Sequence, residues 1–533
     1  MAATANREEL GGTGQASEGW TVERVTRASR LNGANGIRTG KDGRIYVAQV
    51  AGSTVSAIDP DTGAIEVISP VGGPIVAPDD LCFDEDGNIY CTEITEGSVR
   101  MLAPDGTSRV IWGETPVANP ITYHQGRLIS GECFYGGRIM ELDRNGGAPR
   151  VILDNAPMPN AFEVGPDGKL YFPAMATNEI WKLDLDTGET EVVAGDLGVP
   201  DSVKFDAQGR IVSTQVGSGQ VLRLNLQTGE REVLADIGPG LDNVAFVGDR
   251  IFVSHITGSI HEIVSPGNAK PLVEQGFQWP LGMDVAADGS LLVSDGGFDY
   301  AIAPGGEPQL VGMLFSPNFP GWTRDIAAGE GGTWIVTTAD GNVARWDPAA
   351  QESEVLASGY DRLMGVALAP GGAIVTAEYG TGKVLSVAGG NVETLAKGLS
   401  APMGVAVAPD GTVYVAESGG GRVVKLAGGR AESVIDGLGT PEGLAIAGGK
   451  LYVIDTKAKQ LVAHDLGTGE QQVIASGLPV GYPQGAIVKP LGGVGDMCGP
   501  MTMFTGVAAS EDGTVYLAGN LEGSVLAVKP EGR

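Results

Sequence analysis

The sequence predicts an all-β protein made of two consecutive six-bladed β-propellers, with twelve four-stranded blades of about 40 residues each. Three observations support this prediction: a unit that recurs twelve times, glycine-containing turns between its strands, and a change in residue type at the seventh unit. Glycine accounts for 84 of the 533 residues, which is about twice its usual share. Because apolar residues still make up 42%, the glycines indicate many short strands joined by tight turns, and neither a disordered nor a collagen-like chain.

Each repeat unit combines a short apolar run, a glycine turn, an alternating strand, a second glycine turn and a further strand. The first strands of the twelve units start at Asn35, Asp79, Asn119, Asn160, Asp201, Asp242, Leu281, Arg324, Met364, Met403, Glu442 and Thr505. Successive starts lie 39–44 residues apart, except for a spacing of 63 before the last. A period near 40 with four short strands is typical of a propeller blade.

The turns within each unit have the composition of β-hairpin loops. Asp-Gly and Gly-Gly pairs stand between the first two strands, and Thr-Gly pairs follow the third, as in 59–63 and 465–469. Such pairs suit two-residue turns that need positive φ. Because propellers usually carry about four to eight blades, twelve units favour two rings of six.

The domain boundaries follow from this division. We expect a flexible leader over 1–18, a first propeller over 19–268 and a second over 269–533. The last unit lacks a fourth strand, and 21–29 reads as a spare strand. We therefore expect 21–29 to complete the sixth blade and 270–276 to complete the twelfth, so that no sheet edge stays open. The long spacing predicts an insertion at 478–504, which is either a lid over the second ring or packing between the rings.

The residues that open the first strands of the first ring are all oxygen donors: Asn35, Asp79, Asn119, Asn160, Asp201 and Asp242. In a propeller these positions converge on the central axis. Hard divalent cations, Ca²⁺ or Mg²⁺ more than Zn²⁺, take such all-oxygen shells. The alternative is that Asn and Asp merely cap turns, but the second ring does not repeat the pattern. The sequence thus predicts a divalent metal ion on the first axis.

The ends of the second strands share a face with these positions. In the first ring they include Glu93, Glu132 and His255, so we expect these three to surround the metal, with His255 able to carry a proton near neutral pH. A histidine that only hydrogen-bonds a strand end is the alternative. We expect Asp201, His255, Glu93 and Glu132 to be the catalytic candidates.

The second ring has a different character. Its opening positions are mostly apolar, with Arg324 and Glu442 as an opposed pair of charges, and these two are the candidate functional residues there. Acids end several of its second strands, as in 414–417 and 452–455, and we expect them to accept hydrogen bonds from neighbouring turns.

Composition and charge exclude several partner classes. The formal charge is −30, which disfavours nucleic acid and anionic membranes and otherwise only aids solubility. The four cysteines have no metal-type spacing, and no signal peptide or 18-residue apolar run is present, so a cytoplasmic protein with reduced thiols is expected. There is no nucleophile elbow, P-loop, dinucleotide fingerprint or zinc-protease motif. We expect a small-molecule substrate, whereas the oligomeric state is open.

The first ring resembles the family of six-bladed propellers that contains senescence marker protein, gluconolactonase and luciferin-regenerating enzyme. The resemblance lies in PNAFEVGPDGKLYF (159–172) and PDSVKFDAQGRIVST (200–214). It implies that Asn160 and Asp201 are metal ligands and that Asp201 also serves as a base. The family's N-terminal Glu ligand is missing, and Asn35 occupies the nearest place. The second ring is similar to NHL-type and virginiamycin B lyase-like repeats, as in 409–423, without the lyase family's paired His and Glu signature.

These observations lead to one main functional hypothesis and two alternatives. The main one is a divalent-metal-dependent hydrolase of a lactone or related cyclic ester, in which Asp201 or His255 takes the proton from water. The alternatives are a metal-assisted carbon–oxygen lyase or isomerase, and a non-enzymatic double-propeller binding scaffold. Propellers host all three, so the fold alone does not separate them.

Overall fold

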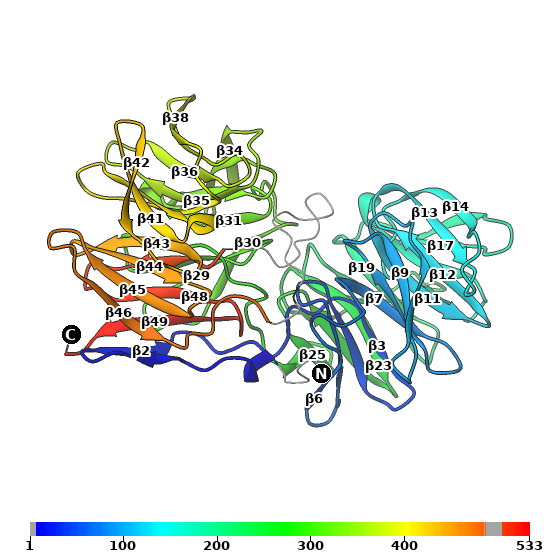
Figure 1. Ribbon diagram of the computed structural model, residues 1–533. Coiled ribbons are helices and arrows are strands. Elements are labelled where there is room, and N and C mark those ends of the chain that lie inside the picture. Colours follow the sequence, from blue (N-terminus) through cyan, green and yellow to red (C-terminus); the bar gives the residue numbers. More distant parts are fainter. Residues whose placement is uncertain (1–6, 484–485, 487–503, 533) are drawn as a thin grey trace. The chain divides into compact units, whose positions relative to one another are not determined.

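The computed structural model describes residues 7–483, 486 and 504–532, and within them the secondary structure is almost entirely β (Figure 1). Twelve antiparallel sheets are formed, eleven of four strands and one of five, which confirms the predicted fold class. Four single-turn 3-10 helices connect strands in the described residues: η1 (Arg7–Glu9), η2 (Met175–Thr177), η3 (Glu330–Gly332) and η4 (Ser418–Gly420). We number the blades 1 to 12 in the order of their first strands.

The first propeller holds blades 1 to 6, each of which runs from an inner strand beside the axis to an outer strand. Its inner strands are β3 (Ile37–Thr39), β7 (Pro78–Phe83), β11 (Ala118–His124), β15 (Glu163–Val164), β19 (Pro200–Phe205) and β23 (Leu241–Val247). The second strands are β4 (Ile45–Gln49), β8 (Ile89–Glu93), β12 (Arg127–Glu132), β16 (Leu170–Ala174), β20 (Ile211–Gln215) and β24 (Arg250–His255). The third strands are β5 (Thr54–Ile58), β9 (Ser98–Leu102), β13 (Tyr135–Leu142), β17 (Glu179–Leu183), β21 (Gln220–Leu224) and β25 (Ile260–Ser265). The outer strands are β6 (Ile65–Ser69), β10 (Ser108–Trp112), β14 (Arg150–Pro157), β18 (Thr190–Ala194), β22 (Arg231–Asp236) and β26 (Asn268–Val273).

The second propeller holds blades 7 to 12 and repeats this plan. Its inner strands are β27 (Met283–Val285), β31 (Thr323–Ala328), β35 (Leu363–Leu368), β39 (Pro402–Val407), β43 (Pro441–Ala447) and β47 (Val507–Ala509). The second strands are β28 (Leu291–Ser294), β32 (Trp334–Thr338), β36 (Ile374–Glu378), β40 (Val413–Glu417), β44 (Lys450–Asp455) and β48 (Val515–Gly519). The third strands are β29 (Phe298–Ile302), β33 (Val343–Asp347), β37 (Lys383–Ala388), β41 (Arg422–Ala427), β45 (Gln460–Asp465) and β49 (Ser524–Pro530). The outer strands are β30 (Gln309–Met313), β34 (Glu352–Ala357), β38 (Asn391–Lys397), β42 (Arg430–Ile435) and β46 (Gln471–Ser476) in blades 7 to 11, and β2 (Trp20–Arg24) in blade 12. β1 (Gln15–Ala16) adds a fifth strand to blade 11.

Each ring is closed by contact between its first and last inner strands, β3 with β23 and β27 with β47. The apolar cores lie between neighbouring sheets. Ile37 and Ile45 of blade 1, for example, pack in one cluster with Phe252 and Ile260 of blade 6. Because every blade buries both faces in this way, the alternating strands of the sequence give sheets that are stable only within a closed ring.

The expected closing strands were wrong in both rings. β2, which overlaps the expected strand 21–29 over residues 21–24, pairs with β49 and so completes blade 12 of the second propeller (Figure 1, β2 in blue beside β49 in red). The expected strand 270–276 contributes to β26, which pairs with β25 and completes blade 6. The physical reason is local. A tight turn at Pro266–Gly267 returns the chain directly onto β25, whereas β49 is followed by no further strand in the described residues.

The domain boundaries shift accordingly. One compact unit comprises residues 30–276 and Ala486, and the other comprises 7–29, 277–483 and 504–532. Residues 7–18 are not a flexible leader, because β1 pairs with β46 and the buried Arg7 donates hydrogen bonds to the carbonyls of Phe277 and Asn520. Most of the expected insertion, 478–504, lies outside the described residues. Its two expected roles, as a lid or as packing between the rings, therefore stay predictions.

Candidate functional site

Backbone irregularities place four of the six oxygen-bearing side chains at the start of the inner strands of the first propeller, whereas Asn35 and Asn160 lie just before β3 and β15. The pairing register shifts between Pro78 and Leu81, between Ala118 and Ile121, between Pro200 and Ser202, and between Leu241 and Val244. Each shift spans a predicted site position, namely Asp79, Asn119, Asp201 and Asp242. A bulge of this kind turns a side chain away from the regular pleat. The irregular strand starts therefore hold these side chains in place.

Two hydrogen bonds link neighbouring members of this ring. Asn35 Nδ2 donates to Asp242 Oδ2 at 3.3 Å, and Asn160 Nδ2 donates to Asp201 Oδ2 at 3.1 Å. The amide oxygens of both asparagines accept backbone N–H groups, from Val50 at 3.2 Å and from Ala161 at 2.7 Å. These two asparagines therefore orient the aspartates of adjacent blades, and their own oxygens are already occupied.

Two fully buried oxygens of the ring have no partner among the described residues. Asp201 Oδ1 and Asn119 Oδ1 are buried and have no hydrogen-bond donor within the described residues. An unpartnered buried acceptor costs about 1–3 kcal/mol, so it indicates a site for a bound group or water. Both oxygens belong to residues predicted as metal ligands.

The three aspartates interact electrostatically. Burial raises the pKa of Asp79 and of Asp201 well above the ordinary value, and repulsion by Asp242 adds to the effect in both. Burial raises the pKa of Asp242 to about 7. A cation in the ring would offset this repulsion, because an opposite charge favours the ionised carboxylate.

The ring suits a hard cation by its chemistry, with amide and carboxylate oxygens only. However, among the described residues no three His, Cys, Asp or Glu side chains form a group that could hold a metal ion. An ion would therefore need an amide oxygen beside the carboxylates. Asn119 Oδ1 and Asp201 Oδ1, which are buried without a donor in the described residues, fit this role, and the neighbouring Asp79 supplies a second carboxylate.

His255 lies at the end of β24, as expected, but both ring nitrogens are occupied. Nε2 donates to the carbonyl of Pro239 at 2.8 Å, and Nδ1 accepts from the Thr257 hydroxyl at 2.7 Å. Burial lowers the pKa of His255 to about 4, so the ring is neutral at pH 7. This geometry favours the alternative of a histidine that secures the strand end.

Glu93 and Glu132 are also engaged by protein groups. Glu93 accepts the Val76 N–H at 2.9 Å and pairs with Arg100 at 2.7 Å. Glu132 accepts the Arg138 N–H at 2.9 Å and forms an ion pair with the same residue's guanidinium. Their positions match those of Glu417 and Asp455 in the second propeller, which accept loop N–H groups as predicted for that ring. The contacts favour a structural role for Glu93 and Glu132, and their catalytic role stays a prediction.

Sequence analysis missed a second charged layer in the first propeller, three residues further along the inner strands. Lys204 Nζ lies 3.1 Å and Arg38 Nη1 lies 3.4 Å from Glu163 Oε2. Burial opposes ionisation of Glu163, yet the two cations lower its pKa below the ordinary value. The signal was present, since NGIRTG, AFEVG and DSVKFD carry charges at the same offset in otherwise apolar strands.

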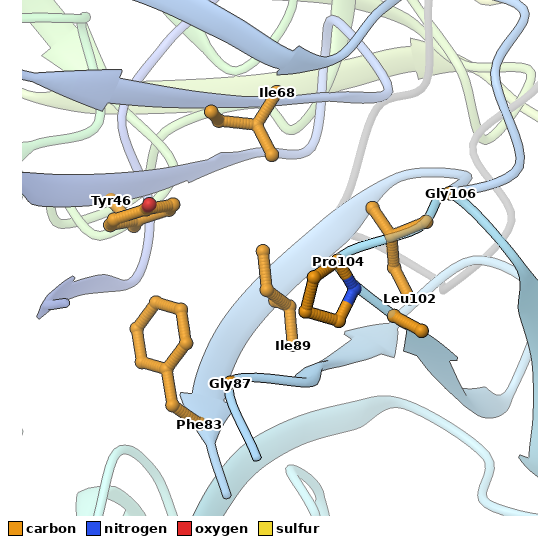
Figure 2. Close-up of a pocket in the computed structure, with 9 residues that line it drawn as sticks. Tyr46, Ile68, Phe83, Gly87, Ile89, Leu102, Pro104 and Gly106 are labelled. Carbon is orange, nitrogen blue, oxygen red and sulfur yellow. The ribbon is translucent and has the colours of Figure 1, made fainter. Parts of the chain in front are cut away.

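Two further features lie away from the ring. Arg324 and Glu442 are buried at the inner strand starts of the second propeller, and no ion pair joins them. A cavity of about 250 Å³ lies in the first propeller between blades 1 and 2 (Figure 2). Tyr46, Phe83 and Pro104 line it, and none of the predicted site residues does.

Within the described residues, no helix is long and apolar enough to span a membrane.

The solved structures that resemble the chain include a streptogramin B lyase (20% identity, TM-score 0.39, covering 52% of this chain and 96% of that one). A virginiamycin B lyase from Staphylococcus aureus aligns with 16% identity and a TM-score of 0.38, covering 51% of this chain and 95% of that one. A nidogen/laminin complex chain aligns with 20% identity and a TM-score of 0.37, covering 40% and 86%. No curated protein matches the chain. Residues 122–254, which span blades 3 to 6 from β11 to β24, match the family model described as the SMP-30/Gluconolactonase/LRE-like region.

Proposed function

We propose that the first propeller is a divalent-metal-dependent hydrolase of a lactone or related cyclic ester. The observation that carries the proposal is the buried ring of Asn and Asp side chains in which Asp201 Oδ1 and Asn119 Oδ1 have no partner among the described residues. The family match over residues 122–254 supports it, because that family includes gluconolactonases and the matched region contains Asp201.

Different residues of the ring bind the ion, orient a ligand and accept the proton in this proposal. Asp201, Asn119 and Asp79 would hold a Ca²⁺ or Mg²⁺ ion, with Asn160 fixing the orientation of Asp201 through its 3.1 Å hydrogen bond. When bound, the ion would polarise the ester carbonyl and lower the pKa of water. Asp201 Oδ1 would hold the ion, and Oδ2, which accepts one hydrogen bond from Asn160 and can accept another, would take the proton of the attacking water.

The experiment combines metal content with turnover. The full-length protein and Asp201→Asn are measured for bound metal by elemental analysis, with circular dichroism as the check on folding, and are assayed on a panel of lactones by acid release. We expect about one divalent ion per chain in the wild type, and loss of both ion and activity in folded Asp201→Asn. Asp249→Asn, in an exposed turn of blade 6, is the matched control and keeps both.

Two outcomes would contradict the proposal. Metal-free but folded wild-type protein that still turns over a lactone would remove the ion from the mechanism. A metal-dependent reaction whose product carries no oxygen from H₂¹⁸O would assign the site to lyase or isomerase chemistry instead.

A further inference from the structure

The axis of the second propeller carries two buried charges that the proposed hydrolase does not use. Six side chains open its inner strands, and all of them are buried: Leu281, Arg324, Met364, Met403, Glu442 and Thr505. The inner strands contact one another in chain order, and β27 contacts β47 to close the ring. Arg324 on β31 and Glu442 on β43 are three blades apart in a ring of six, so they face each other across the axis.

Arg324 is a buried guanidinium with unused donors. It is 1% exposed, and its Nε and Nη2 find no hydrogen-bond partner within the described residues. No ion pair of Arg324 is recorded there either. Burial lowers its pKa to about 10, which leaves it charged at pH 7. Tyr482 and Asp340 act on the pKa of Arg324 electrostatically, but neither accepts a hydrogen bond from its Nε or Nη2. A buried donor without an acceptor is unfavourable, so these two nitrogens indicate a place for a bound acceptor.

The two free nitrogens are those of the side-on edge of the guanidinium. Elsewhere in the same propeller, Arg24 uses this edge to bind a carboxylate, with Nε donating to Glu522 Oε1 at 2.7 Å and Nη2 donating to Oε2 at 2.9 Å. This is the bidentate geometry in which arginine recognises carboxylates. Arg324 therefore presents the same edge to the axis with no carboxylate of the described chain bound to it.

Glu442 supplies an acceptor on the opposite side. Its Oε1 accepts from the Thr456 hydroxyl at 2.9 Å, while Oε2 has no donor within the described residues. Tyr482 lies close enough to Arg324 and Glu442 for both to act on the pKa of its hydroxyl, which burial raises. Its ring stacks on Trp279 with centroids 5.4 Å apart. The axis thus carries a cation on blade 8 and an acceptor on blade 11, and the buried Leu281, Met364 and Met403 open the inner strands of blades 7, 9 and 10.

Glycines close the axis one residue further along the inner strands. A Cβ at Gly404 would lie 2.2 Å from the carbonyl oxygen of Glu442, and one at Gly443 would lie 2.3 Å from that of Thr505. A Cβ at Gly506 would lie 2.4 Å from the carbonyl oxygen of Leu281. Neighbouring backbones therefore meet directly at these three positions. In blade 8 the same level carries Asp325, whose Oδ2 accepts the Val366 N–H at 2.8 Å.

We propose that the second propeller binds a small hydroxycarboxylate on its axis, with the carboxylate on Arg324 and the hydroxyl donating to Glu442. The carboxylate accepts two hydrogen bonds, from Nε and Nη2, and the hydroxyl donates one to Oε2. Leu281, Met364 and Met403, the buried apolar residues at the other inner strand starts, contact the carbon chain. This binding does not depend on the reaction assigned to the first propeller.

The test is calorimetric titration of the full-length protein with ω-hydroxycarboxylates from glycolate to 6-hydroxyhexanoate, each compared with the plain carboxylate of equal length. We expect one member of the series to bind at least about tenfold more tightly than its plain counterpart, because the Glu442 acceptor is satisfied only by the hydroxyl. Arg324→Gln is expected to weaken binding by roughly tenfold to a hundredfold. Glu442→Gln is expected to remove most of the preference for the hydroxyl.

Arg345→Gln is the matched control, because this arginine forms an exposed ion pair with Glu354 in the same propeller. It should leave binding unchanged. Circular dichroism checks that each variant folds, and Arg324→Lys, which keeps the charge but not the bidentate edge, replaces Arg324→Gln if that variant does not fold. The proposal is overturned if no hydroxycarboxylate binds the wild type at millimolar concentration, or if binding is equal in the folded arginine variant.

Discussion

A strand from the N-terminal part of the chain closes the second propeller, and we predict that a proline in this strand weakens its pairing with β49. β2 pairs with β49 through five residue pairs, from Trp20 with Pro530 to Arg24 with Leu526. The Val25 N–H donates to the Val525 carbonyl, and the Glu531 N–H donates to the Gly19 carbonyl. Hydrogen-bonded pairs alternate along an antiparallel ladder, so Glu23 and Ala527 also form such a pair. Glu23→Pro removes one ladder donor from this pair.

The expected size of the effect follows from that single donor. Proline has no N–H, and the Ala527 carbonyl loses its partner, which costs about 1–3 kcal/mol of local stability. A loss of this size corresponds to roughly 5-fold to 150-fold faster opening of the pairing. Glu23→Ala is the matched control: it removes the same exposed side chain, which pairs with Lys529, and keeps the N–H.

The assay is native-state hydrogen exchange read by mass spectrometry, which resolves local opening along the chain. Amides of β49 and β48 should exchange faster in Glu23→Pro than in Glu23→Ala, while peptides from β24, β25 and β26 in blade 6 stay unchanged. Faster exchange in blade 6, or equal exchange of β49 in the two variants, would refute the pairing of β2 with blade 12.

Three further predictions concern buried groups of the two rings. Burial raises the pKa of Glu442 from 4.5 to about 7. The folded state therefore binds the proton more tightly than the unfolded state does, and the stability of the protein falls as pH rises from about 4.5 to about 7. In urea denaturation, Glu442→Gln should be more stable than wild type by up to about 3 kcal/mol at pH 8 and about equally stable at pH 4. A difference that is the same at both pH values would contradict this. Gly404→Ala places a Cβ 2.2 Å from a backbone oxygen and should cost at least about 1–3 kcal/mol by thermal denaturation, whereas Gly113→Ala, with its nearest atom at 4.0 Å, should have little effect. Glu163→Gln removes the carboxylate that contacts Lys204 and the partly exposed Arg38, while Asp80 still acts on both cations. It should destabilise by about 1–3 kcal/mol, against less than about 1 kcal/mol for the exposed Glu191→Gln, and equal effects of the two substitutions would contradict this expectation.

Sequence patterns predicted the blades because the information they need is local. The alternation of Val, Ile and Leu with polar residues sets strand faces, and the glycines at the turns supply positive φ, as at Gly43, Gly87 and Gly168. The positions Asp79, Asn119, Asp201 and Asp242 were also predictable, since equal offsets in equal repeats place side chains at equal depth in the ring. Their bulged conformation and burial agree with that expectation.

The sequence did not indicate which partner each polar group would find. His255 and Glu93 share the right strand ends with the ring, but their hydrogen-bonding capacity is taken by Pro239, Thr257, Val76 and Arg100. These contacts involve side chains and loops whose spacing from the site residue varies between blades. Equivalent positions in the repeats therefore predict which side chains lie near one another, but not whether their hydrogen-bonding atoms are already used by other protein groups.

By itself, the sequence determined the twelve blades, their division into two rings and the axial positions of the charged side chains, because each of these depends on periodicity within about 40 residues. Only the tertiary structure decided how the rings close and which axial groups lack a partner. β2 and β49 are joined by almost the whole chain, and their pairing is selected because the open edge of β49 needs hydrogen bonds that no adjacent segment of the described chain supplies. The unpartnered edge of Arg324 likewise results from the packing of six separate blades around one axis.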